Sequence, residues 1–301
     1  MFKRLIIPLD GSRLSEAVLP TAIYVAEKLQ ATVILVHVIE RNAPKQIHGE
    51  PHLSDPREAE AYLEEVQRSR FPASIRVERH VHSTAIADVA RSIVDHAKEL
   101  ESDLVMMCTH GQSGLRKLLF GSIAQQVVAL RVPVLLIRPM DNGSAPAPSG
   151  KPFMVPLDGS EVREQALLVA SAMATACGAS LKLLMVVPTL DTLSGVETTS
   201  RLLLPATTQE LLALAREDAV NYLEGLVAQV AGQGADASAR IRRGDLAETI
   251  VNEARNLDVD FIVMATAGKA GMDAFWSGSV APKVSSRTHL PLLLLPTVQC
   301  S

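Results

Sequence analysis

The chain lacks the features that mark several large protein classes. Its three cysteines, Cys108, Cys177 and Cys300, are scattered and have the spacing of neither a zinc site nor a disulfide framework. No apolar run approaches the roughly 18 residues of a membrane-spanning helix, and the chain opens on an expected strand rather than a signal peptide. The histidines show no metal-ligand spacing. We therefore expect a reduced, cytoplasmic protein without membrane insertion or a metal site.

Aromatic residues and strongly basic stretches are also scarce. Aromatic residues make up 3% of the chain and hydrophobic residues 48%, a composition that suits an aliphatic α/β core. The net charge of −4 gives no pull toward nucleic acid, so no nucleic-acid partner is expected. A length of 301 residues suggests two domains, each large enough for its own core.

Strand-like and helix-like segments alternate through residues 1–140. Such alternation predicts a parallel sheet covered by helices on both faces. Pro20 should disturb the first turns of the first helix. We expect strands at 4–9, 32–39, 74–81, 104–107 and 134–137, helices at 15–29, 57–69, 84–100 and 123–130, and a loop at 41–56.

The pattern then starts again after a flexible linker at residues 141–150. Residues 153–160 match residues 5–12 at an offset of 148. We therefore predict a tandem duplication, with a first domain at 1–140 and a second at 151–301. The second copy is expected to have strands at 153–157, 181–187, 239–243, 261–264 and 292–295, and helices at 208–231 and 246–256.

A loop with glycines recurs in both copies after the fourth expected strand. It runs over residues 108–122 and again over 265–279, and in each copy nine residues separate the loop glycine from a Gly-Ser pair. A loop between a strand and a helix lets backbone N–H groups approach an anion. Ser122 is expected either to cap the helix that follows or to turn its hydroxyl toward a ligand oxygen.

These motifs resemble the universal stress protein family, present twice. The resemblance rests on Pro-Leu-Asp-Gly-Ser after strand one, His37-Val38 in strand two, Thr-His-Gly after strand four, the nine-residue spacer with Gly-Ser, and the closing Val-Pro-Val strand. Cys108 and Ala265 stand where the family pattern has its first glycine. The resemblance implies two tandem, doubly wound, five-stranded parallel sheets of order 3-2-1-4-5, flanked by helices in the adenine nucleotide alpha hydrolase-like fold. It also implies that many members bind ATP while others do not.

The resemblance implies an adenine-nucleotide site in each copy, with ATP as the ligand, either alone or with Mg²⁺. Arg116 and Lys117 attract phosphate and Asp273 repels it, so tighter binding is expected in the first copy. The implied residues of the first copy are Pro8, Leu9, Asp10, Val38, Met107, Cys108, His110, Gly111, Gly121, Ser122 and Ile123. Those of the second are Pro156, Leu157, Asp158, Val186, Met264, Ala265, Gly268, Gly278, Ser279 and Val280.

Several of these residues have a second interpretation. Asp10 and Asp158 stand at the carboxyl edge of a sheet, where ligands bind, but an aspartate before Gly-Ser is also a turn-former. Cys108 is either a redox-sensitive thiol or, as we favour, a buried and inert one. We expect His37 to be a hydrogen-bonded core residue, and His110 to be a loop residue rather than an acid or base.

The leading functional hypothesis is a regulatory stress protein that binds an adenine nucleotide and acts on an unidentified protein partner. The loop lacks the Gly-Lys-Ser/Thr ending of a P-loop, so we expect no enzyme with fast hydrolysis. One alternative is an interaction module of the same fold without nucleotide binding, and another is a slow ATPase or phosphotransferase.

The closing strands of the two copies, 132–137 and 290–295, are both strongly apolar. In the implied strand order each lies at a sheet edge, and an exposed apolar edge is an aggregation hazard. We therefore expect the two strands to pair antiparallel, which makes the chain an intramolecular pseudo-dimer.

Overall fold

The computed structural model describes residues 1–43, 46–47, 50–109, 121–192, 205–266 and 280–297. The chain forms two compact units, one made of residues 1–149 and 268–296, the other of residues 150–267 and 297–301. The described residues 280–296, which the repeat assigns to the second copy, therefore group with the first unit. The domain boundaries at 140 and 151 stay a prediction.

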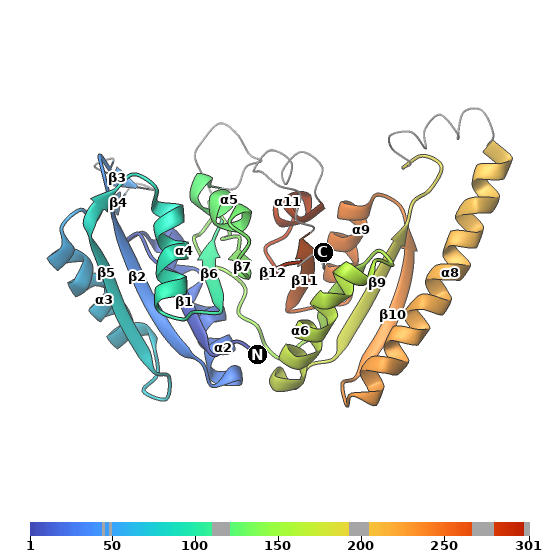
Figure 1. Cartoon of the computed structure of the whole chain (residues 1–301), viewed down its shortest axis with the longest axis horizontal. Helices are drawn as coiled ribbons and strands as arrows, with labels where there is room; N and C mark the ends of the chain where they lie inside the picture. Colours follow the sequence, from blue (N-terminus) through green and yellow to red (C-terminus); the bar gives the residue numbers. More distant parts are fainter. Residues whose placement is uncertain (44–45, 48–49, 110–120, 193–204, 267–279, 298–301) are drawn as a thin grey trace. The chain divides into compact units, whose positions relative to one another are not determined.

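The first unit is an α/β layer structure with a mainly parallel sheet (Figure 1). Its strands follow the order β12-β7-β6-β1-β2-β5. In chain order its elements are β1 (Arg4–Pro8), α1 (Arg13–Glu16), α2 (Leu19–Leu29), β2 (Thr32–Glu40), β3 (Gln46–Ile47), β4 (Glu50–Pro51), α3 (Pro56–Arg70), β5 (Val77–Ile86), α4 (Val89–Glu99), β6 (Leu104–Cys108), α5 (Ser122–Ala129), β7 (Val134–Ile137), α11 (Val280–Ser285) and β12 (Leu292–Pro296).

The central strand of this unit shows why the sheet is covered on both faces. Leu5, Ile6 and Ile7 of β1 are fully buried, so side chains pointing to either face of the strand lie in the core. Figure 1 shows α4 and α5 in front of the sheet and α2 and α3 behind it. The predicted α/β fold class, a mainly parallel sheet flanked by helices, is confirmed.

The second unit repeats this architecture with the strand order β10-β9-β8-β11. Phe153 and Phe261 pack in its core with ring centroids 4.5 Å apart. Its elements are β8 (Phe153–Leu157), α6 (Glu161–Cys177), β9 (Leu181–Val187), α8 (Pro205–Gly232), β10 (Ala237–Arg243), α9 (Leu246–Asn256) and β11 (Phe261–Thr266).

Pro20 has the effect expected of it. The first helix of the chain is split into α1 and α2, with Pro20 in the first turn of α2, where its missing N–H needs no partner. The corresponding position of the second copy, at the offset of 148, is Leu168, and there α6 is one continuous helix.

The predicted antiparallel pairing of the two closing strands is confirmed. β12 pairs with β7 in the register Leu292↔Leu136, Leu293↔Leu135 and Leu294↔Val134. Each of these leucines and Val134 is at most 2% exposed. The pairing covers the free edge of β7, which supplies the protection that an apolar edge strand needs.

Two predictions about local structure are wrong. The helix expected from residue 84 begins at Val89, because β5 continues to Ile86, which pairs with Glu40 of β2 after a register shift. Asp88 then caps α4 by accepting from Arg91 N–H at 2.9 Å. The expected loop at 41–56 contains the short β3–β4 ladder. No helix in the described part of the chain is both long enough and apolar enough to cross a membrane.

Candidate functional site

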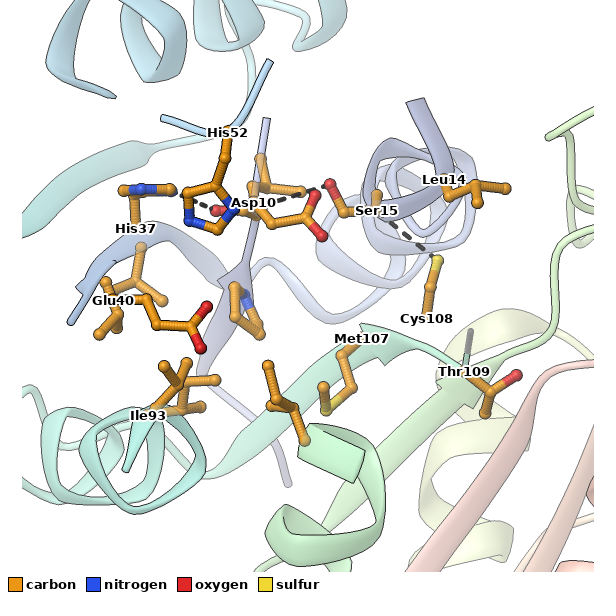
Figure 2. Close-up of a pocket in the computed structure, with 16 residues that line it drawn as sticks. Asp10, Leu14, Ser15, His37, Glu40, His52, Ile93, Met107, Cys108 and Thr109 are labelled. Atoms are coloured by element: carbon orange, nitrogen blue, oxygen red, sulfur yellow. Dashed lines mark hydrogen bonds between the residues drawn. The ribbon is translucent and has the colours of Figure 1, made fainter. Parts of the chain in front are cut away.

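A cavity of about 80 Å³ opens at the carboxyl edge of the first unit's sheet (Figure 2). It lies where β1 and β6 are neighbours but the helices that follow them cover opposite faces (Figure 1). Open α/β sheets bind ligands at such a reversal of winding. The lining residues are Pro8, Leu9, Asp10, Leu14, Ser15, Val36, His37, Val38, Glu40, His52, Val89, Ile93, Met107, Cys108, Thr109 and Ile123.

The cavity brings together most of the residues predicted for the first copy. Seven of them line it: Pro8, Leu9, Asp10, Val38, Met107, Cys108 and Ile123. His110 and Gly111 lie outside the described residues. Gly121 and Ser122 stand at the start of α5 and do not line the cavity. The expected cap at Ser122 is wrong by one residue, because Gly121 holds the cap position with φ −58° and ψ 146°, and Ser122 is the first helical residue.

Asp10 forms the turn that leaves β1. Its Oδ1 accepts from the N–H of Ser12 at 2.9 Å and from the Ser12 hydroxyl at 2.6 Å. The Ser12 hydroxyl oxygen in turn accepts from Ser15 N–H at 3.2 Å, which caps α1. The turn-forming interpretation is therefore confirmed. The turn uses the Oδ1 oxygen of the Asp10 carboxylate, and the Asp10 side chain also lines the cavity.

His37 joins this turn to residues 50–53, which we call the strap. Its Nδ1 lies 2.7 Å from the Leu9 carbonyl and its Nε2 lies 3.1 Å from the Leu53 carbonyl. A neutral imidazole has one N–H and donates to one of the two carbonyls, whereas the imidazolium donates to both. His37 is 2% exposed, so the expected hydrogen-bonded core histidine is confirmed.

The Leu53 side chain of the strap also packs against Gly11. Gly11 has φ +90°, and a Cβ added there would lie 2.8 Å from Leu53 Cδ1. On the other side of the contact, Glu50 Oε2 accepts from the N–H of Arg13 at 2.7 Å. The backbone conformation favours glycine at position 11, and any side chain there would displace the Leu53 side chain.

His52 and Glu40 were not predicted, yet both line the cavity. Both ring nitrogens of His52 are buried, and neither has a hydrogen-bond partner among the described residues. In Figure 2, His52, Asp10 and His37 lie along the upper part of the view, and Glu40, Ile93 and Met107 lie below. The cavity therefore combines apolar walls with the carboxylates of Asp10 and Glu40 and with the imidazole of His52. Among the described residues, only the His52 imidazole of these three groups is known to leave all its hydrogen-bonding atoms unpaired.

Cys108 closes one side of the cavity and is 9% exposed. Its thiol lies 3.6 Å from the Ser15 carbonyl. Burial, and then the negative charge of Asp10, raises the pKa of the thiol well above its ordinary value. Because the thiolate is the reactive form, the interpretation of Cys108 as an inert thiol is favoured over a redox role.

The second copy repeats the turn, while residues 198–201, which correspond to the strap at the offset of 148, lie outside the described residues. Asp158 Oδ1 accepts from the N–H of Ser160 at 3.2 Å and from its hydroxyl at 2.7 Å. The register of β9 on β8 places Met185 where the first copy has His37. The added Cβ of Gly159 would meet Met185 Cε at 3.7 Å, which is an ordinary contact.

The remaining predicted residues of the second copy lie at strand ends or outside the description. Pro156 and Leu157 end β8, Val186 lies near the end of β9, and Met264 and Ala265 lie near the end of β11. Val280 is the first residue of α11, which groups with the first unit. Gly268, Gly278 and Ser279 lie outside the described residues. Ligand contact by any of these residues stays a prediction.

A cluster of three histidines, also not foreseen, lies beside the cavity. His96 Nε2 is 2.9 Å from His82 Nδ1, and its ring centroid is 4.4 Å from that of His80. His96 Nδ1 is also 2.9 Å from Glu99 Oε2. Burial first, and then His96 and His82, lowers the pKa of His80. Among the described residues, no three histidine, cysteine or acidic side chains are placed to hold a metal ion.

One sequence signal could have pointed to part of this cluster. His80 and His82 alternate with Val81, so in a strand they share one face. His96 belongs to a helix, and only the packing of α4 shows that it faces them. His52 and Glu40 carry no such signal, because the strap's position depends on its contacts with Gly11, Arg13 and His37.

The model of the Universal stress protein family matches residues 1–138 and again residues 150–296. Among curated relatives, the chain is 28% identical over 149 residues to universal stress protein MJ0531 of Methanocaldococcus jannaschii, which covers 46% of this chain and 83% of that protein. It is 26% identical over 148 residues to universal stress protein YxiE of Bacillus subtilis, covering 46% of this chain and 100% of the relative.

Solved structures agree on the fold across both copies. A universal stress protein from Archaeoglobus fulgidus matches with a TM-score of 0.67 at 17% identity, covering 99% of this chain and 97% of that one. A protein described as a putative universal stress protein from Pseudomonas aeruginosa matches with a TM-score of 0.67 at 15% identity, covering 98% and 94%. With the family model matching nearly the whole length in two segments, the chain belongs to the universal stress protein family.

Proposed function

We propose that the cavity of the first unit binds the base of an adenine nucleotide, with ATP as the leading ligand. The observation that carries the proposal is the position of the cavity, at the winding reversal between β1 and β6, with seven residues of the motifs typical of the family in its walls. Its 80 Å³ give room for about five to eight water molecules, which is enough for one planar base and too little for a whole nucleotide.

The charges in the cavity favour the base rather than the phosphates. Asp10 and Glu40 are the acidic residues of its lining, and a phosphate beside them would be repelled. Their carboxylates accept hydrogen bonds from amino and hydroxyl groups. Side chains such as Val36, Val38 and Ile93 offer apolar contact to a flat ring. By family resemblance, the phosphates belong to the loop between β6 and α5.

We further propose that the bound nucleotide regulates the protein and is not rapidly hydrolysed. The loop between β6 and α5, to which the phosphates are assigned, lacks the Gly-Lys-Ser/Thr ending of a P-loop, whose lysine reaches the terminal phosphates. Phosphoryl transfer depends on cationic groups that stabilise the charge of the transferred phosphoryl. The nucleotide would then act by changing what an unidentified protein partner recognises, with turnover below about 1 s⁻¹.

The direct test is ligand-dependent melting of the full chain, with titration calorimetry for stoichiometry. ATP should raise the melting temperature, because a ligand of the native state stabilises it. Val89→Trp should fill the cavity and remove one binding event, while Leu168→Trp, on an exposed face of α6, should leave binding unchanged. Absence of binding by the unaltered protein would favour the interaction module without a nucleotide. Unchanged stoichiometry in Val89→Trp would place the site elsewhere.

A further inference from the structure

We infer that His52 is a recognition residue of this cavity: its imidazole N–H donates to a ring nitrogen of the bound base. The inference rests on the proposed function, and it assigns the ligand contact to a strap residue that no motif marks. Three observations carry it: how the strap is fixed, what the His52 ring lacks, and which groups share the cavity with it.

The strap holds His52 from both sides. On its N-terminal side, the Glu50 carboxylate accepts from Arg13 N–H at 2.7 Å. On its C-terminal side, the Leu53 carbonyl lies 3.1 Å from His37 Nε2, and the Leu53 side chain packs against Gly11. These anchors belong to the turn after β1 and to β2, the same elements that line the cavity. The ring is therefore preorganised at the cavity wall rather than carried on a free loop.

The ring itself is left unsatisfied. Nδ1 and Nε2 of His52 are both buried, and no described residue offers either of them a hydrogen bond. A buried polar group without a partner destabilises the native state, and such groups are rare in native proteins. His37 on β2 shows the contrast, because each of its ring nitrogens lies within hydrogen-bond distance of a carbonyl oxygen. A ligand that hydrogen-bonds His52 would remove the penalty.

The neighbouring groups indicate which ligand chemistry fits. A neutral imidazole offers one donor and one acceptor. When ionised, the carboxylates of Asp10 and Glu40 accept hydrogen bonds and donate none. His52 therefore brings the N–H that an unprotonated ring nitrogen requires. An adenine base carries both a donor amino group and acceptor ring nitrogens. The cavity thus matches a base whose amino group faces a carboxylate while a ring nitrogen faces His52.

The experiment compares three variants of the full chain. His52→Phe keeps a ring of similar shape and removes both nitrogens, and His52→Gln restores a donor and an acceptor. His289→Phe is the matched control, because this histidine lies outside the cavity, where its Nδ1 is 3.1 Å from the Arg138 carbonyl. Calorimetry with ATP and with adenosine gives the affinities, and thermal unfolding without ligand gives the stabilities.

We expect His52→Phe to bind both ligands about tenfold more weakly, the loss of roughly one hydrogen bond. His52→Gln should stay within about threefold of the unaltered protein, and His289→Phe should bind unchanged. The ligand-free melting temperature of His52→Phe should not fall, since an apolar ring replaces an unsatisfied polar one.

Two results would overturn the inference alone: equal affinity in His52→Phe, or a clear loss of ligand-free stability, which would make His52 a structural residue. If the unaltered protein binds neither ATP nor adenosine, the proposed function fails, and the inference falls with it. The two failures are distinguishable because the second is seen without any variant.

Discussion

The two copies carry different side chains between their third strand, β5 or β10, and the helix that follows it, α4 or α9. In the first, His80 and His82 of β5 contact His96 of α4. The register of β5 on β2 matches that of β10 on β9, so Arg240 and Arg242 occupy the corresponding positions in the second copy. His96 and Glu253 are each the eighth residue of an 11-residue helix that follows an aspartate cap. Three imidazoles thus correspond to an Arg–Glu–Arg group.

The difference separates a permanent charge network from a titratable one. Arg242 Nε lies 2.9 Å from Glu253 Oε1, and Arg240 lies 3.6 Å from Oε2. Arginine and glutamate are, as residue types, charged at neutral pH. Imidazoles change charge near neutrality.

In the first copy, the cluster of His80, His82 and His96 lies beside the cavity. Val36 and Val38 pair with His80 and His82, and both valines line the cavity. Ile93, one turn before His96, lines it as well. The cluster therefore adjoins two walls of the proposed site.

The largest expected effect comes from breaking the charge network of the second copy. Glu253 is 7% exposed, so Glu253→Ala leaves two arginines facing each other without their shared carboxylate. Because both arginines are partly exposed, we expect a loss of about 2–3 kcal/mol in the free energy of unfolding. Glu248→Ala, exposed on the same helix, is the control. Chemical denaturation measures both, and a loss below about 0.5 kcal/mol in Glu253→Ala would show that the network contributes little.

A second prediction concerns a contact that the copies share. Tyr62 donates to Glu16 at 3.2 Å and Tyr222 donates to Glu164 at 2.8 Å. Burial first, and then Glu16, raises the pKa of Tyr62; burial and the hydrogen bond to Glu164 raise that of Tyr222. Tyr62→Phe and Tyr222→Phe should each destabilise by about 1 kcal/mol. Strongly unequal losses in denaturation experiments would show that this contact is not equivalent in the two copies.

A third prediction uses the lowered pKa of His80. A histidine whose native pKa lies below its unfolded value of about 6.5 stabilises the protein above that pH, and the contribution is lost as the pH falls through the native pKa. Glu60 and Glu99 oppose the shift, and Glu60 is also paired with Arg79. Between pH 7 and pH 5, hydrogen exchange corrected for its intrinsic pH dependence should show α4 and β5 losing protection while α9 and β10 keep it. Equal losses in both copies would contradict the comparison.

The smallest expected effect is a change in how steeply the hydrogen-exchange protection of α4 and β5 depends on pH. Replacing the cluster by its counterpart, His80→Arg with His82→Arg and His96→Glu, should leave the first copy folded and flatten the dependence of α4 and β5 protection on pH. The single change His289→Phe should leave that dependence in place. A triple variant that keeps the original pH dependence would show that other groups, such as His37, carry it.

The sequence was most informative where a residue type determines the local backbone structure by itself. Buried aliphatic runs predicted the central strands, and Asp-Gly-Ser predicted the turn after the first strand of each copy. Pro20 predicted a disturbance in the first turns of the first helix, although not its division into two helices. The cavity followed from the family motifs, because they stand at strand ends that meet at one edge of the sheet. The nucleotide contacts themselves stay predictions.

The rest depended on contacts between distant segments. Residues 84–86 have helical periodicity with the segment after them, but pairing with β2 extends the strand through them. His96 meets His82 only because α4 packs beside β5, and His52 reaches the cavity only through the strap's anchors. Neither juxtaposition is encoded in a local pattern.

Photoaffinity labelling tests the central claim, adenine-nucleotide binding in the first unit's cavity, most directly. The full chain is labelled with 8-azido-ATP, digested, and its modified peptides are identified by mass spectrometry, with excess ATP as competitor. We predict labelled peptides that contain lining residues, from β2, the strap, α4 or β6, and loss of that label under competition. Labelling that ATP does not displace, or that falls only on peptides from 150–267, would contradict the account.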